Sequence, residues 1–119
     1  MNLRHRLVAN SLVVVVESPR LESSNTEEFK AQCAALIEAG HRDLIFDLSQ
    51  VDFMDSRGLG CLISLFKLVS PDGGVSLAGL NRHVLDLFKL TRLDRIFPIY
   101  RDQQHALAAK TEEADGKNA

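Results

Sequence analysis

A run of four consecutive valines, Val13–Val16, constrains the fold more than any other feature of the sequence. Valine favours strands, and an unbroken apolar run cannot alternate apolar with polar residues. Such a strand is covered on both faces, as in the interior of a sheet that helices flank. The strand predicted at Leu12–Glu17 follows a similar run at Leu3–Val8, and the polar turn at Asn10 and Ser11 between them predicts a hairpin.

Strands and helices alternate over the rest of the chain. The spacing of apolar residues predicts strands at 44–48, 75–78 and 96–100. It also predicts four helices: one from a cap at Ser24 or Asn25 to Gly40, one with its apolar residues at 59–69, one from Asn81 through Phe88, and one at about 103–110. Asn81 and Asp102 are the expected caps of the last two helices. This order predicts an α/β fold, a mixed sheet of about five strands flanked by about four helices. One domain is expected over residues 1–110, followed by a disordered polar tail at 111–119.

Charge and hydropathy exclude several functional classes. The 119-residue chain has a formal net charge of -2 and a pI near 6.0, without the basic stripe that nucleic-acid-binding domains carry, so no nucleic-acid partner is expected. The apolar runs are far shorter than the roughly 20 residues of a membrane helix. Asn10 and Ser11 interrupt the only stretch that imitates a secretory signal. We therefore expect a cytoplasmic protein without a membrane partner.

No metal or cofactor site is expected. The two cysteines, Cys33 and Cys61, lie in apolar helical patterns, which favours reduced, structural thiols. The four histidines lie in separate segments, without a spacing that suits a metal ion. No glycine-rich phosphate-binding motif is present.

The most informative segment is the strand-to-helix loop at residues 47–60, which contains three carboxylates, two serines and two glycines. Ser56 falls where a helix N-cap is expected, so either Ser56 or Asp55 satisfies the free amides of the next helix. An exposed hydroxyl at a helix N-terminus can also accept a phosphoryl group, whose charge the helix dipole tolerates. Gly58 and Gly60 are interpreted as sites of close helix packing. A serine-hydrolase elbow would need glycines where Asp55 and Arg57 flank Ser56, so no catalytic residue is predicted.

Residues 51–60, Val-Asp-Phe-Met-Asp-Ser-Arg-Gly-Leu-Gly, resemble the signature of STAS-domain anti-sigma factor antagonists. The resemblance extends over most of the chain, through the first hairpin, the Gly-Gly turn at 73–74 and the segment 87–93. It implies a non-enzymatic partner-switching protein. By position, Ser56 would be the serine that an anti-sigma factor with serine kinase activity phosphorylates. The unphosphorylated protein would bind that kinase, and a metal-dependent serine phosphatase would restore it.

Two positions depart from the family pattern. Pro19 and Arg20 stand where a flexible turn is usual, and Arg57 replaces a small or hydroxyl residue. Arg57 is interpreted either as a phosphate contact or as a solvated side chain. Met54 is either a soft contact residue beside the switch or part of the core. The expected partner-binding surface comprises Ser23, Ser24, Asn25, Met54, Asp55, Arg57, Gly58 and Leu59.

Two other interpretations remain open. A phospho-aspartate receiver has a similar length and an aspartate at a strand end, where Asp47 stands here, but the acidic pair and the lysine that receivers need are missing. A STAS regulatory subunit of a transporter would share the fold without the switch.

Overall fold

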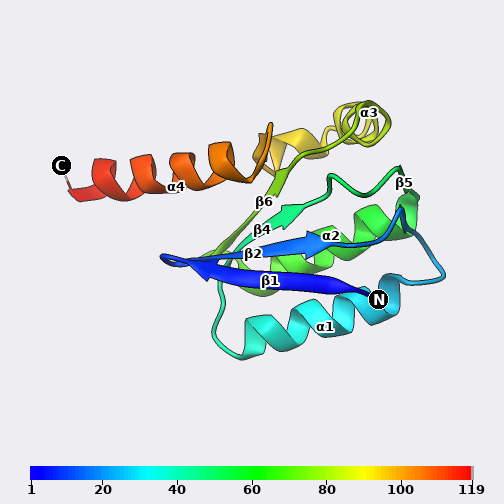
Figure 1. The fold of residues 1–119 in the computed structure, drawn as a ribbon, viewed down its shortest axis with the longest axis horizontal. Coiled ribbons are helices and arrows are strands. Elements are labelled where there is room, and N and C mark those ends of the chain that lie inside the picture. The colour runs from blue at the N-terminus through cyan, green and yellow to red at the C-terminus, as the bar shows by residue number, and fades with distance from the viewer. Residues whose placement is uncertain (119) are drawn as a thin grey trace.

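The computed structural model describes residues 1–118 as a mixed sheet with helices on both faces (Figure 1). The main sheet contains β1 (Leu3–Val8), β2 (Ser11–Val16), β4 (Asp43–Asp47), β6 (Gly74–Ala78) and β7 (Ile99–Tyr100). The helices are α1 (Thr26–Glu38), α2 (Ser56–Val69), α3 (Arg82–Leu90) and α4 (Gln103–Asn118). The shorter elements are β3 (Arg20–Leu21), β5 (Phe53–Met54) and the 3-10 turn η1 (Leu93–Arg95).

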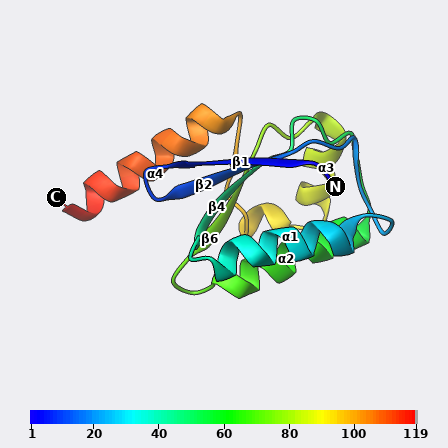
Figure 2. The same ribbon diagram turned by 60° about the horizontal axis from the view of Figure 1, so that its bottom comes forward.

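The sheet has the strand order β1-β2-β4-β6-β7. β1 pairs with β2 in antiparallel orientation, and the other three pairs are parallel. The predicted hairpin and the mixed α/β fold are therefore confirmed. Figure 2 shows α1 and α2 side by side under one face of the sheet, with α4 across the other.

The valine run is buried from both sides, as predicted. Val14 and Val16 belong to the large core cluster that β2 shares with α1 and α2. Val13 points to the opposite face, where it packs with Ile45 and with Ala106 of α4. Val13, Val14 and Val16 are fully buried, and Val15 is half-buried. One strand thus contributes to both cores, which explains why its sequence has no polar residue between Leu12 and Val16.

A second, two-stranded sheet was not expected from the sequence. β3 and β5 pair in parallel, with Arg20 opposite Phe53 and Leu21 opposite Met54. The carbonyl of Pro19 accepts hydrogen bonds from the backbone N–H groups of Asp52 and Phe53 at 2.8 and 3.1 Å. The segment that follows β2 is thereby attached to the loop before α2.

The largest differences from the predicted boundaries lie in the last strand and the last helix. The last strand begins at Ile99 rather than Ile96, because the N–H groups of Ile96 and Phe97 both donate to Leu93 of η1. The last helix runs to Asn118, whereas the sequence prediction ended it near Lys110. The stretch Glu112, Glu113 and Ala114 consists of good helix formers, which favours continuation of the helix past Lys110, whereas Gly116 is a weak one.

The expected caps of α3 and α4 are confirmed. The side chain of Asn81 accepts a hydrogen bond from the N–H of Val84 at 2.9 Å. Asp102 does the same for the N–H of His105 at 2.9 Å. These caps supply acceptors for N–H groups that have no partner inside a helix.

Candidate functional site

The candidate site is the edge at which the β3–β5 sheet meets the N-termini of α1 and α2. Ser56 is the first residue of α2 and is exposed. It is not the N-cap, because Asp55 occupies that position with an extended backbone and a side chain that accepts from Gly58. Since Asp55 does the capping, the Ser56 hydroxyl makes no hydrogen bond to the described residues and faces solvent.

Asp55 holds two segments together. Its Oδ1 accepts a hydrogen bond from the Gly58 N–H at 3.0 Å, and its Oδ2 accepts one from the Ser23 N–H at 3.1 Å. The hydrogen bond from Gly58, with a smaller contribution from Ser23, lowers the pKa of Asp55 below its usual value. The carboxylate therefore joins the loop before α1 to the start of α2, directly beside Ser56.

Gly58 is required for close packing at this junction. A Cβ atom there would lie 2.5 Å from the carbonyl oxygen of Leu21 and 2.6 Å from Cγ of Met54. The first turn of α2 thus lies against β3 and β5, where no side chain fits. This agrees with the prediction that Gly58 permits close packing, although the neighbour is the small sheet rather than the main one. The same prediction is wrong for Gly60, which is exposed and where an added Cβ would meet nothing within 4 Å.

Three residues predicted to contact a partner are buried. Met54 is 2% exposed and Leu59 is 7% exposed, and both belong to the main core. Gly58 is buried against Leu21. The interpretation of Met54 as a surface contact is therefore corrected, because the pairing of β5 with β3 directs its side chain inward.

The other predicted contact residues lie together at the site. Ser23, Ser24 and Arg57 are exposed, and Asn25 and Asp55 are half-buried. Asn25 occupies the N-cap position of α1 without a capping hydrogen bond. Its amide instead accepts from the Glu22 N–H at 3.0 Å and donates to the Arg20 carbonyl at 2.8 Å, which shapes the loop that presents the two serines.

A stack of three side chains beside the site was missed. The Arg20 guanidinium lies 4.3 Å from the centroid of the Phe53 ring, which stacks on His83 of α3 at 6.2 Å. This contact joins β3, β5 and α3. No sequence signal could have found it, because the three residues are far apart in the chain and each is a common residue in a loop or at a surface.

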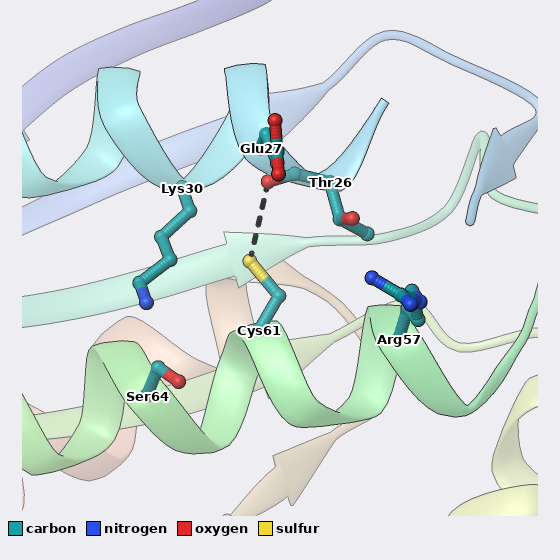
Figure 3. Close-up of a pocket in the computed structure, with 6 residues that line it drawn as sticks. All are labelled: Thr26, Glu27, Lys30, Arg57, Cys61 and Ser64. Carbon is teal, nitrogen blue, oxygen red and sulfur yellow. Dashed lines mark hydrogen bonds between the residues drawn. The ribbon is translucent and has the colours of Figure 1, made fainter. Parts of the chain in front are cut away.

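Arg57 lines a shallow groove between α1 and α2 (Figure 3). The groove has a volume of about 210 Å³ and is lined by Thr26, Glu27, Lys30, Arg57, Cys61 and Ser64. Cys61 points across it, and its Sγ lies 3.7 Å from the Thr26 carbonyl oxygen.

The carboxylates of the loop do not form a metal site in the part of the chain that is described. Asp47, the candidate receiver aspartate, accepts hydrogen bonds from the Ser49 N–H and from the side chain of Gln103. It thereby helps to attach α4 to the end of β4. Neither of these hydrogen-bond partners is a lysine, the residue that a receiver requires at the end of its last strand.

The two cysteines are free and buried. Burial raises the pKa of the Cys33 thiol to about 12 and that of Cys61 to about 11. The structure agrees with the predicted reduced, structural role. Within residues 1–118, no helix has the length and apolarity needed to cross a membrane.

Comparisons with known proteins agree with this architecture. The chain is 31% identical over 90 residues to BtrV of Bordetella bronchiseptica, covering 75% of this chain and 78% of that protein. It is 28% identical over 110 residues to the anti-sigma F factor antagonist of Paenibacillus polymyxa, covering 90% and 94%. The crystal structure of TM1081 from Thermotoga maritima has a TM-score of 0.80 at 28% identity, covering 90% and 92%.

SpoIIAA of Bacillus, solved in unphosphorylated and phosphorylated forms, shares the fold at TM-scores of 0.78 and 0.69 and identities of 18% and 17%. The coverage is 93% of this chain and 97% of SpoIIAA for the first form, and 91% and 98% for the second. The family model of the STAS domain matches residues 4–106. The chain therefore belongs to the STAS domain family, among relatives that are named anti-sigma factor antagonists.

Proposed function

We propose that this chain is an anti-sigma factor antagonist whose binding is switched by phosphorylation of Ser56. In its unmodified form it binds an anti-sigma factor that is also a serine kinase. Phosphorylation of Ser56 by that kinase releases it, and a metal-dependent serine phosphatase restores it. The observation that carries the proposal is the exposed hydroxyl of Ser56, which stands free at the first residue of α2 because Asp55 supplies the cap.

The position suits a reversible charge switch. A phosphoserine carries a charge of about -1.5 to -2, which the N-terminal end of a helix stabilises. The modification therefore leaves the fold intact. On the surface it places a dianion directly beside Asp55, and a dianion within a protein contact opposes binding through desolvation and repulsion.

The comparisons support the same function. A relative that aligns over nearly the whole chain is named an anti-sigma F factor antagonist, and SpoIIAA, which shares the fold, exists in a phosphorylated form. The proposed role is regulatory, with the kinase and the phosphatase supplying the chemistry and this chain supplying the acceptor. No cofactor is part of the proposal.

Mass spectrometry tests the proposal directly. The protein is incubated with ATP and an anti-sigma kinase from its own organism, and the intact mass and the modified peptide are determined. We expect one phosphate on Ser56 and none on Ser56→Ala. The matched control is Ser70→Ala, which removes an exposed hydroxyl at the opposite end of α2 and should be phosphorylated like the wild type.

Other outcomes would reject the switch. An acid-labile phosphate on Asp47 would support the receiver interpretation instead. If the wild type binds the kinase but is not phosphorylated, the chain is an unregulated binding module. If it neither binds nor is modified, and copurifies with a membrane ATPase, it is a transporter subunit.

A further inference from the structure

The groove between α1 and α2 begins one residue after Ser56. Arg57, Cys61 and Ser64 recur at helical spacing on one side of α2, and Thr26 and Lys30 do the same on α1. Figure 3 shows Lys30 reaching from α1 and Arg57 from α2, with Cys61 between them. The groove therefore runs along both helices away from the candidate phosphorylation site.

The groove has a cationic lining. Lys30 and Arg57 form no ion pair within 4.0 Å with any described residue. Glu27 is the single acidic side chain among its lining residues, so two cations face one anion. The net charge of the groove lining is therefore positive, whereas the whole chain has a formal net charge of -2. A groove of this charge favours an acidic ligand.

Gly60 is not among the lining residues, but it lies one helical turn from Arg57 and from Ser64 on α2, beside the groove. Gly60 is exposed, and a Cβ atom there would meet nothing within 4 Å. Glycine inside a helix lowers stability by about 0.5–1 kcal/mol relative to alanine, and no contact among the described residues explains a glycine at this position. The Ser64 hydroxyl already donates to the Gly60 carbonyl at 3.0 Å, so it needs no partner of its own.

We propose that this groove receives an acidic segment of the anti-sigma partner, with its carboxylates directed at Lys30 and Arg57. The inference rests on the proposed function and extends it, because it assigns a second contact surface beside the switch. It also gives phosphorylation an added effect. A phosphate on Ser56 adds negative charge next to Arg57 and repels the acidic segment at the entrance to the groove.

Charge reversal tests the groove. Lys30→Glu and Arg57→Glu are compared with Arg101→Glu, which reverses an exposed cation between β7 and α4. The dissociation constant of the complex with the anti-sigma kinase is measured at low and high salt. Each groove variant should weaken binding about tenfold or more and reduce its salt dependence, whereas Arg101→Glu should have little effect. Thermal unfolding of each variant establishes that the fold is retained.

The outcomes separate this inference from the proposed function. If the wild type binds and is phosphorylated on Ser56 but the groove variants bind equally well, the groove is not a docking surface and the switch stands. If the variants bind normally but are phosphorylated more slowly, Arg57 or Lys30 contacts ATP phosphate, which also overturns the inference. If the wild type forms no complex, the proposed function fails and the docking inference fails with it.

Discussion

The carboxylate of Asp55 accepts a hydrogen bond from the backbone N–H of Ser23 at 3.1 Å, although the two residues are 32 positions apart in the chain. The same carboxylate caps α2 through Gly58. One side chain thus fixes both the loop that presents Ser23 and the helix that presents Ser56. The geometry of the candidate surface depends on the ionised form of this group.

Replacement of Asp55 by asparagine should lower stability at neutral pH and remove a pH dependence. The pKa of Asp55 is lowered in the folded state, so its contribution is present above the unfolded value of about 3.9 and is lost as the pH falls through the folded value. Asparagine can still cap a helix but does not titrate. Urea unfolding of both proteins is measured between about pH 7 and pH 2.5. The difference between their free energies of unfolding should become smaller as the pH falls. A difference that stays constant over this pH range would contradict the stabilising role of the ionised Asp55 carboxylate.

The two glycines of α2 should respond in opposite directions to alanine. Gly58→Ala places a Cβ against the Leu21 backbone and Met54, and we expect a loss of about 1–3 kcal/mol. Gly60→Ala meets open space and should gain about 0.5–1 kcal/mol. Denaturant titrations measure both values. Equal effects of the two substitutions would show that the packing at Gly58 is looser than described.

Gly60→Ala has a second expected consequence at the docking groove. If a partner segment approaches α2 closely, the added methyl group should weaken the complex with the anti-sigma kinase while the isolated protein becomes more stable. Calorimetry measures the affinity of the complex, and thermal unfolding measures the stability of the free protein. A variant that is more stable and binds as tightly as the wild type would place the contact elsewhere.

Met54→Ala should destabilise the protein by about 2–5 kcal/mol, because it empties a buried site in the main core. Any loss of partner binding should then follow from unfolding and disappear under conditions in which the variant is fully folded. Unchanged stability together with weakened binding would instead make Met54 a surface contact.

The two thiols should be inert in the folded protein. Burial raises the pKa of Cys33 to about 12 and that of Cys61 to about 11, so the reactive thiolate is scarce at pH 8. A thiol reagent such as DTNB should label both cysteines only after denaturation. Rapid labelling of the native protein would mean that α1 and α2 separate in solution.

Elements with long apolar patterns could be predicted from the sequence, whereas contacts between very short segments that are far apart in the chain could not. Val13–Val16 indicated a strand buried on both faces, and Asn81 and Asp102 were correctly identified as caps because capping is local. β3 and β5 have two residues each, too few to show a period, and the residues that pair between them are 33 positions apart in the chain. Without that pairing, Met54 had no visible reason to turn inward.

The same limit applies to the candidate site. The motif placed Ser56 at a helix start, but which residue caps the helix depends on the direction of the Asp55 side chain, and that direction is set by both Gly58 and the distant Ser23. The groove between α1 and α2 is also a product of helix packing. Its cations come from separate helices, and nothing in the local sequence joins Lys30 to Arg57.

The most direct test of the switch is the affinity of the anti-sigma kinase for the protein carrying phosphoserine at position 56, introduced during translation, compared with the unmodified protein. Because a dianion in the contact opposes binding, we expect affinity to fall by at least about tenfold, while the thermal stability of the free protein stays the same or rises. Equal affinity of the two forms, with both folded, would contradict the account.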